Sequence, residues 1–337
     1  MLYGLIFVVV GLYFFVYFWY NTGSVENMVN IDKLALGDIM NGFISKIQRY
    51  STKDGPGVRT TVFAVGCNLN CHWCANPELI DDGVKFLYHP NRCVKCGACV
   101  EKSDGTIQLT DEGCIIDRKN TNLEECSSVC YYDAYERIGE AITANELVDK
   151  LLRDKVFYDQ SNGGVTFSGG DAVLQADFFH EVALILKSNN VHVALDTAGF
   201  FSWEKLEPLI KAVDLILYDI KILDNTQHKY YTGVDNRLIL ENAIKIADMG
   251  KDMIVRMILI PGVNDSESEI VGRLNFVKNL GSKVKLDLLK HHKLGAGKYA
   301  GLGLVDPMEQ IPACSNDVAE YAENLARNMN IAVTIGG

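Results

Sequence analysis

Gly66-Cys-Asn-Leu-Asn-Cys-His-Trp-Cys74 places three thiols on one short loop, with the spacing C-x3-C-x2-C. The apolar, β-branched run Arg59–Val65 precedes it and predicts a strand that leads into the loop. Three thiolates hold three irons of a four-iron cluster and leave the fourth iron open to another ligand. Structural zinc, the alternative, takes four ligands, so His72 would have to be the fourth. Since His72 stands between two thiols on a tight loop, we expect its ring to point away and predict an iron–sulfur cluster.

The composition narrows the classes of protein to which the chain can belong. Its 43 acidic residues outnumber its 32 basic residues, and the formal net charge is -11. Nucleic-acid binding relies on a basic surface, so we predict no nucleic-acid partner. Nine of the ten cysteines lie between Cys67 and Cys130, at close spacings that suit metal or cluster ligands better than disulfides. Such thiols imply a reducing compartment, and we expect the catalytic part of the chain to be cytoplasmic.

Beyond the cysteine-rich stretch, short apolar runs alternate with amphipathic ones. Buried parallel strands show such runs, so this alternation predicts a parallel sheet, either a barrel or doubly wound. Thr143-Ala-Asn-Glu146 and Ser266-Glu-Ser-Glu269 have the pattern of capping boxes at helix starts. Polar residues close several strands, at the edge where barrel enzymes carry their chemistry. The predicted strands are Gly164–Ser168, His192–Asp196, Leu215–Asp219, Met253–Ile260, Val284–Leu289 and Ile331–Ile335.

Further motifs surround the three-thiol loop in a fixed order. Asp54-Gly-Pro-Gly-Val-Arg-Thr60 precedes it, and Ala75-Asn-Pro-Glu78 follows it. The later motifs are Gly163-Gly-Val-Thr-Phe-Ser-Gly-Gly170, Leu195-Asp-Thr-Ala-Gly199, Tyr218-Asp-Ile-Lys221, Arg256 with Ile260-Pro-Gly262, and His292-Lys-Leu-Gly-Ala-Gly-Lys-Tyr299. From about Ile44 to Gly337 the chain resembles the radical S-adenosylmethionine (SAM) enzymes that activate glycyl radical enzymes.

The resemblance implies an α/β fold, a partial (β/α)6 TIM-like barrel with a ferredoxin-like iron–sulfur insert. We therefore expect four stretches: residues 1–40, an apolar N-terminal segment; 44–87, the start of the radical SAM core with the cluster loop; 88–134, the insert; and 135–337, the remainder of the barrel.

The resemblance also implies roles for individual residues. Cys67, Cys71 and Cys74 hold the catalytic [4Fe–4S] cluster, and Asp54 and Asn76 receive the glycine loop of the partner. Asp196 and Thr197 match positions that bind a monovalent cation. Asp171 stands where the family usually has Glu, one methylene longer. The residues expected at the SAM site are Trp73, Ser168, Gly169, Gly170, Asp171, Asp196, Asp219, Lys221, Arg256 and His292.

A second cysteine group resembles a two-cluster ferredoxin with ligands missing. In that topology the last cysteine of each set ligates the cluster of the other set. Cys93, Cys96 and Cys99 thus pair with Cys130 and complete one auxiliary [4Fe–4S] cluster. The other cluster lacks its ligands, including one near Ser103, and of its own set retains only Cys126, a further candidate iron ligand. We predict one auxiliary cluster; Cys114 is a small buried thiol or an additional iron ligand.

The first 25 residues carry no charge, and Leu2 to Tyr20 is almost wholly apolar and aromatic. A helix over this run would span ~30 Å of hydrocarbon. No basic residue precedes it and no small-residue cleavage site follows, which disfavours a signal peptide. Two interpretations remain: a membrane anchor through residues 2–20, and a natural start at Met28 or Met40.

The family resemblance implies a reaction. The enzyme cleaves SAM reductively to a 5′-deoxyadenosyl radical, which takes a hydrogen from a glycine of a partner glycyl radical enzyme. A ferredoxin or flavodoxin-type protein supplies the electron. Two segments, Cys71–Glu78 and Glu125–Ala134, favour an arylacetate decarboxylase of the 4-hydroxyphenylacetate type as partner. A dehydratase or lyase, a small-molecule substrate, and a noncatalytic electron-transfer role are the alternatives.

Overall fold

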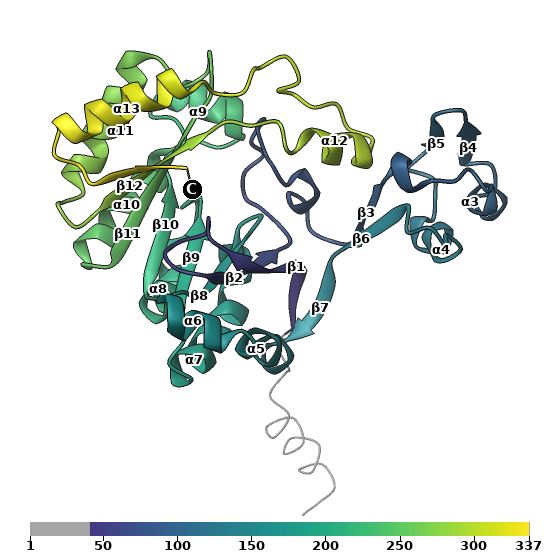
Figure 1. Cartoon of the computed structure of the whole chain (residues 1–337), viewed down its shortest axis with the longest axis horizontal. Helices are drawn as coiled ribbons and strands as arrows, with labels where there is room; N and C mark the ends of the chain where they lie inside the picture. The colour runs from purple at the N-terminus through teal and green to yellow at the C-terminus, as the bar shows by residue number, and fades with distance from the viewer. Residues whose placement is uncertain (1–40, 337) are drawn as a thin grey trace, which may run out of the picture. The chain divides into compact units, whose positions relative to one another are not determined.

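A computed structural model describes residues 41–336, which contain one nine-stranded sheet and a small insert (Figure 1). The strand order is β13-β12-β11-β10-β9-β8-β2-β1-β7. From β2 to β13 neighbouring strands are parallel, whereas β1 is antiparallel to both β2 and β7. The strands are β1 Asn41–Ser51, β2 Arg59–Ala64, β7 Glu140–Thr143, β8 Gly164–Gly169, β9 His192–Thr197, β10 Leu215–Asp219, β11 Asp252–Leu259, β12 Lys285–Lys290 and β13 Val333–Ile335.

Helices connect the parallel strands, and each new strand is added beside the previous one. Adding successive parallel strands on one side only is typical of a barrel. Among the described strands, the two edge strands of the sheet, β13 and β7, do not pair with each other. The predicted partial barrel is confirmed, although β1 and β7 were not foreseen. The main helices are α5 Ala144–Leu152, α6 Lys155–Ser161, α7 Ala176–Ser188, α8 Trp203–Ala212, α9 Asn225–Thr232, α10 Arg237–Asp248, α11 Glu267–Asn279, α12 Ala296–Leu302 and α13 Asn316–Asn328, with the 3-10 turns η2 Pro77–Leu79 and η4 Ala172–Gln175.

Side chains alternate between the two faces of each strand. On β10, Ile216 and Tyr218 join the core that the helices cover, whereas Leu217 belongs to a separate apolar cluster with Ala194 of β9. Successive residues of a strand point to opposite faces, so Asp219 lies on the same face as Leu217. The alternation therefore puts the polar strand ends on the interior face of the partial barrel.

Both predicted helix starts are capped. At α5 the capping box is complete, because Thr143 accepts from the backbone of Glu146 and the Glu146 side chain accepts from Thr143. At α11, Ser266 accepts from the Glu269 amide, but the Glu269 carboxylate instead accepts from the Leu223 amide at 2.6 Å. The capping box of α11 is thus only half formed. Its glutamate, Glu269, instead connects the helix to the loop after β10.

The insert has the strand–helix–strand arrangement of a small ferredoxin. Its strands form two antiparallel pairs, β3 with β6 and β4 with β5. Arg118 connects it to the barrel, because its guanidinium donates to Phe86 O at 2.8 Å and to Gly301 O in α12. The elements are β3 Lys85–Tyr88, η3 Pro90–Arg92, α3 Ala98–Lys102, β4 Ile107–Thr110, β5 Gly113–Ile116, α4 Leu123–Ser128 and β6 Tyr135–Ile138.

The apolar run from Leu2 to Tyr20 lies outside the described residues, so the proposed anchor has no structural account here. Within residues 41–336, none of the helices combines the length and the apolar character that a membrane crossing requires.

Candidate functional site

The three-thiol loop follows β2 and is fixed by its backbone. Gly66 and Cys67 donate to Leu79 O and Ile80 O, each at 2.8 Å, and Asn70 donates to Thr232 O at the end of α9. These bonds hold both sides of the loop, so the positions of the thiols do not depend on a bound group alone.

His72 packs against α9. Its ring lies edge-on against Tyr230 and Tyr231, with centroids 5.4 Å apart in both pairs. Its backbone amide donates to Tyr231 O at 2.9 Å. His72 thus belongs to the support of the loop.

The three cysteines of the loop are half-buried and lie near one another. Burial raises the pKa of Cys67 and of Cys71 to about 12, and each lies close enough to the Cys74 thiol for the two to influence each other. Iron binding deprotonates a thiol outright. The set of three adjacent thiols therefore fits the predicted site cluster, with three protein ligands.

A row of charged side chains begins beside this loop and crosses four strands. Lys221 donates to Asp219 at 2.9 Å, and Arg256 donates to the other oxygen of Asp219 at 2.9 Å. Arg256 also binds Asp196, which accepts from Ser168 Oγ at 2.7 Å. We call Ser168, Asp196, Arg256, Asp219 and Lys221 the charged row. It joins the ends of β8, β9 and β10 to the middle of β11, and two carboxylates balance two cations.

Strand register creates this row. Asp219 is paired directly with Arg256 across β10 and β11, and Leu217 with Asp196 across β10 and β9. Burial alone would raise the pKa of Asp219, but Arg256 and Lys221 outweigh it and lower the pKa to about 2. Burial raises the pKa of Asp196, although Arg256 opposes the shift. The row is thus a set of fixed charges in which Lys221 also lies near Cys71.

The glycines of Ser168-Gly169-Gly170 are required by close packing. Gly169 has φ +123, and a Cβ there would lie 2.2 Å from Ala64 N. A Cβ on Gly170 would lie 2.1 Å from Gly66 O. The glycines let the end of β8 approach the start of the three-thiol loop, which keeps the backbone of Ser168–Gly170 beside the thiols.

The carboxylate of Asp171 accepts hydrogen bonds from three groups of the protein. Its side chain accepts from Thr197 Oγ1 at 2.9 Å, from Ala198 N at 3.0 Å and from Val173 N at 3.3 Å. Burial raises the pKa of this carboxyl to about 7, against these three donors. With the shorter side chain in place of Glu, the residue positions Thr197 at the end of β9.

Trp73 and His292, expected at the SAM site, line one small pocket with Cys74. His292 follows β12, and Trp73 is buried against Tyr231, Ile222 and Ile260. The two rings therefore lie on the same side of the cluster loop, close to the third thiol.

The side chain of Asn76 is fixed by Lys298, a contact that the sequence did not predict. Lys298 of α12 donates to Asn76 Oδ1 and to Glu78 Oε1, both at 2.6 Å. Glu78 is only 3% exposed, so this is a buried ion pair directly behind the loop. Both residues stand in motifs quoted above, Ala75–Glu78 and His292–Tyr299, but nothing in the sequence signalled that the two motifs meet.

Asp54 folds back on its own loop. Its carboxylate accepts from Ser51 and Thr61, both at 2.6 Å, and its carbonyl accepts from Thr166. The buried Arg59 donates to Thr166 Oγ1 at 2.7 Å. These bonds anchor the loop to β8.

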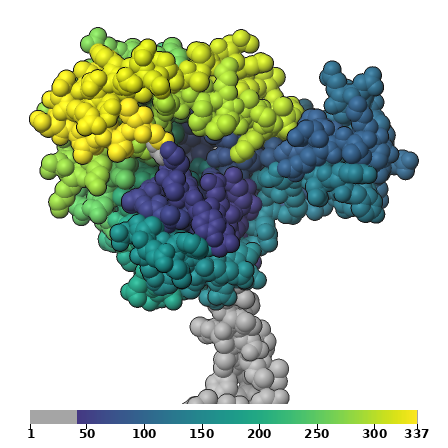
Figure 2. Space-filling model, viewed as in Figure 1, coloured from purple at the N-terminus to yellow at the C-terminus, as the bar shows by residue number. Residues whose placement is uncertain are grey.

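The anchored loop borders a cavity of about 290 Å³ that opens on the face seen in Figure 2, where the first strands (purple) lie beside the C-terminal residues (yellow). Arg256 of the charged row lines this cavity. The other lining residues come from the loop Thr52–Pro56, from β10 to β12 and from Thr334–Gly336.

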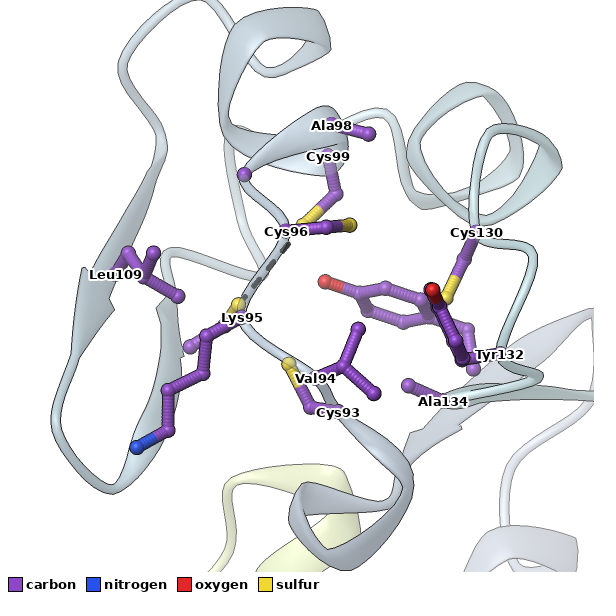
Figure 3. A pocket seen from close by; sticks show the side chains of 13 residues that line it. Cys93, Val94, Lys95, Cys96, Ala98, Cys99, Leu109, Cys130, Tyr132 and Ala134 are labelled. Atoms are coloured by element: carbon purple, nitrogen blue, oxygen red, sulfur yellow. Dashed lines mark hydrogen bonds between the residues drawn. The ribbon is translucent and has the colours of Figure 1, made fainter.

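The insert gathers its thiols around one pocket (Figure 3). Cys93, Cys96, Cys99 and Cys130, the predicted auxiliary ligands, all line it. Cys114 lines it too, with its sulfur 3.8 Å from that of Cys99. A buried hydroxyl, Tyr135 Oη, also lines the pocket and has no hydrogen-bond partner within the described part of the chain. Sulfur donors around an orphaned donor group fit an iron–sulfur cluster.

Cys126 is not among the residues that line the thiol pocket. It is 1% exposed on α4 and belongs to the same apolar cluster as Cys99 and Tyr135, with Leu123 packed against it. Ser103, near the missing ligand, donates to Val100 O and accepts from Ile107 N, which closes a turn. Both residues are thus buried within the insert.

Comparison with known proteins gives the same assignment as the site. Residues 61–274 match the radical SAM superfamily. The trans-4-hydroxy-L-proline dehydratase activating enzyme of Clostridioides difficile is 36% identical over 303 residues, 88% of this chain and 100% of that protein. The 4-hydroxyphenylacetate decarboxylase activating enzyme of Clostridioides difficile is 38% identical over 277 residues, 78% of this chain and 86% of that protein.

Among solved structures, a radical SAM methyltransferase from Sphaerobacter thermophilus shares the fold, with a TM-score of 0.50 and 13% identity over 87% of this chain and 76% of that one. The fold, the three-thiol loop and these relatives agree. The chain belongs to the radical SAM superfamily and, within it, to the activating enzymes of glycyl radical enzymes.

Proposed function

We propose that this chain generates a glycyl radical on an arylacetate decarboxylase, with SAM bound between the three-thiol loop and the charged row. The observation that carries the SAM site is the position of Lys221, which belongs to the row and lies beside Cys71. When bound, a cluster at Cys67, Cys71 and Cys74 would supply the one electron that splits SAM into methionine and a 5′-deoxyadenosyl radical, and that radical would take a hydrogen atom from the partner's glycine.

The charged row binds and orients SAM. The methionine part of SAM carries an ammonium and a carboxylate, and the row offers carboxylates and cations that are already fixed by one another. Ser168, Gly169 and Gly170 present backbone groups to the ammonium. Trp73 and His292 flank the third thiol, where an aromatic ring and an imidazole suit a purine. Because these groups are held before binding, little ordering cost remains for the ligand.

The partner's glycine loop is assigned to the cavity of about 290 Å³ beside Arg256. This cavity reaches the charged row from the open side of the partial barrel, so a chain segment entering it approaches the SAM site. Asp54 shapes the rim through its bonds to Ser51 and Thr61. Asn76, whose side chain is fixed by Lys298, is assigned a contact with the partner's glycine loop next to the three-thiol loop.

One auxiliary [4Fe–4S] cluster is assigned to Cys93, Cys96, Cys99 and Cys130. Four thiols saturate the four irons, so this cluster has no open position for SAM and serves electron delivery or partner docking. A monovalent cation at Asp196 and Thr197 and a ferredoxin or flavodoxin-type reductant complete the proposed set of partners.

The choice of an arylacetate decarboxylase depends on local sequence. The segments Cys71–Glu78, Glu125–Ala134 and Asn162–Gly170 resemble the activating enzyme of 4-hydroxyphenylacetate decarboxylase. A hydroxyproline dehydratase is the second candidate, because the chain matches that activating enzyme over its whole length.

Paired activation assays separate the two partners. The reconstituted chain is reduced with dithionite under anaerobic conditions and mixed with SAM and either purified 4-hydroxyphenylacetate decarboxylase or hydroxyproline dehydratase. Electron paramagnetic resonance (EPR) then detects the glycyl radical. We expect the radical on the decarboxylase, and a radical on the dehydratase alone would overturn the partner assignment. Lys221→Met should abolish the signal, whereas Lys285→Met, at an exposed position of β12, should leave it unchanged.

A further inference from the structure

A buried tyrosine, Tyr135, lines the thiol pocket of the insert, and a second tyrosine, Tyr88, packs against it. Tyr88 ends β3 and Tyr135 begins β6, and the two residues are directly paired across the antiparallel ladder. Their ring centroids are 5.3 Å apart, at an interplanar angle of 41°. Both side chains are buried, at 6% and 8% exposure. The ladder and the ring contact fix where the two hydroxyls lie.

The Tyr135 hydroxyl is the less satisfied of the two. It lines the pocket beside the Cys99 thiol and has no hydrogen-bond partner among the described residues. Leaving a buried hydroxyl without a partner destabilises the folded protein, so a group that accepts its hydrogen bond is expected in the pocket. The remaining pocket surface offers thiols, apolar side chains, Lys95 and the exposed Tyr132.

The Tyr88 hydroxyl already accepts one hydrogen bond from the protein. It accepts from Cys114 N at 2.8 Å, which leaves its own proton free, and it lies beside the Cys93 and Cys114 thiols. A Cβ at Gly113, where φ is +129, would lie 2.7 Å from this oxygen. Only glycine allows the hydroxyl to approach here, so the backbone of β5 is shaped around it.

We propose that Tyr135, assisted by Tyr88, donates a hydrogen bond to the sulfurs of the auxiliary cluster and raises its reduction potential. The proposal rests on the auxiliary cluster proposed above. Adding an electron makes a cluster more negative, and a donor aimed at its sulfurs stabilises the reduced form. Tyr135 is the principal donor, because it lines the pocket whereas Tyr88 is not among the lining residues. The pair thus makes this cluster easier for a protein donor to reduce.

The test uses the full chain with Cys67→Ala, Cys71→Ala and Cys74→Ala, which leaves the auxiliary cluster alone. Its potential is measured by EPR-monitored redox titration. For Tyr135→Phe we expect the equilibrium constant of reduction to fall about tenfold, which is about 59 mV for one electron. Tyr88→Phe should cause a smaller fall. Tyr131→Phe, at a side chain that is 94% exposed, is the matched control and should cause none.

Iron content distinguishes failure of the proposed auxiliary cluster from failure of the role proposed for Tyr135. If the triple variant binds no iron, the auxiliary cluster itself is absent and both proposals fail. If Tyr135→Phe keeps about four irons per chain and its potential is unchanged, only the role of Tyr135 is overturned. Should the Phe variant lose its cluster, 3-fluorotyrosine at position 135 keeps the hydroxyl and makes it a stronger donor. The potential should then rise, and an unchanged potential would overturn the proposal.

Discussion

The molecule holds two groups of thiols whose surroundings differ in kind. The loop Cys67–Cys74 offers three thiols next to a row of fixed charges. The insert offers five thiols around one pocket. The buried Tyr135 and the exposed Tyr132 also line this pocket, and Lys95 is its only charged lining residue among those described. The first group suits a cluster with an open iron and a charged ligand, the second a saturated cluster that carries electrons.

The two groups of thiols also differ in the part of the fold that brings their residues together. The first depends on strand register, because residues from β8, β9, β10 and β11 must align before the charged row exists. The second depends on a local fold of residues 85–138, held by two antiparallel pairs. We therefore expect loss of a thiol to have a different consequence in each group.

Loss of one thiol from each group is the sharpest contrast. Cys71→Ala and Cys130→Ala should each reduce the iron content from about eight to about four per chain. Cys71→Ala should abolish SAM cleavage, since the open iron is lost. Cys130→Ala should retain cleavage with dithionite as reductant. Iron analysis and chromatography of 5′-deoxyadenosine measure both effects.

The core thiol Cys314, in the barrel, provides the control, and Cys314→Ala should keep about eight irons. A Cys130→Ala protein that also keeps about eight irons would remove Cys130 from the ligand set.

Arg256→Met should show how strongly the first group depends on its charges. The change leaves two buried carboxylates without their shared partner, and breaking a buried pair costs about 3–5 kcal/mol. Denaturant unfolding measures this loss, and SAM affinity should fall with it. Arg118→Met is the matched control, because its guanidinium bonds only to carbonyls in the described contacts and should cost about 1–3 kcal/mol. Equal losses in the two variants would contradict an electrostatic role for Arg256.

Asp171 gives the first group a pH dependence. Its folded pKa is raised from 3.8 to about 7, so the folded state binds the proton more tightly than the unfolded state. The stability from this group is present below pH 4 and is lost as pH rises towards 7, by an amount on the order of 4 kcal/mol. Unfolding measured from pH 5 to pH 8 should show this decline, and Asp171→Asn should flatten it. An unchanged slope in the variant would assign the pH dependence to another group.

Cys126→Ser should have the smallest effect. Since Cys126 is buried among apolar side chains and is not among the residues that line the thiol pocket, the variant should retain about eight irons. Burying a hydroxyl in its place should cost about 1–3 kcal/mol, seen as a lower unfolding midpoint. A loss of iron comparable to that of Cys130→Ala would make Cys126 a ligand after all.

Much of the fold followed from local patterns. Each predicted strand is present with ends shifted by up to two residues, because short apolar runs between polar ends are what a covered parallel strand requires. The missed strand β1 has an irregular register with β2 and alternates weakly between buried and exposed residues. Its pairing depends on partners far along the chain, and no local signal reports that.

For the site, the sequence determined the order of the motifs and the candidate ligands. Thiol spacing is a local property, so it indicated the three-thiol loop, and the ferredoxin spacing indicated four thiols that the fold brings to one pocket. Tertiary structure alone decided how the motifs meet. The link from Lys298 to Glu78 and the ladder pairing of Tyr88 with Tyr135 join residues 220 and 47 positions apart. The reason is physical: hydrogen bonds and burial depend on distance in space, which folding sets after the local elements have formed.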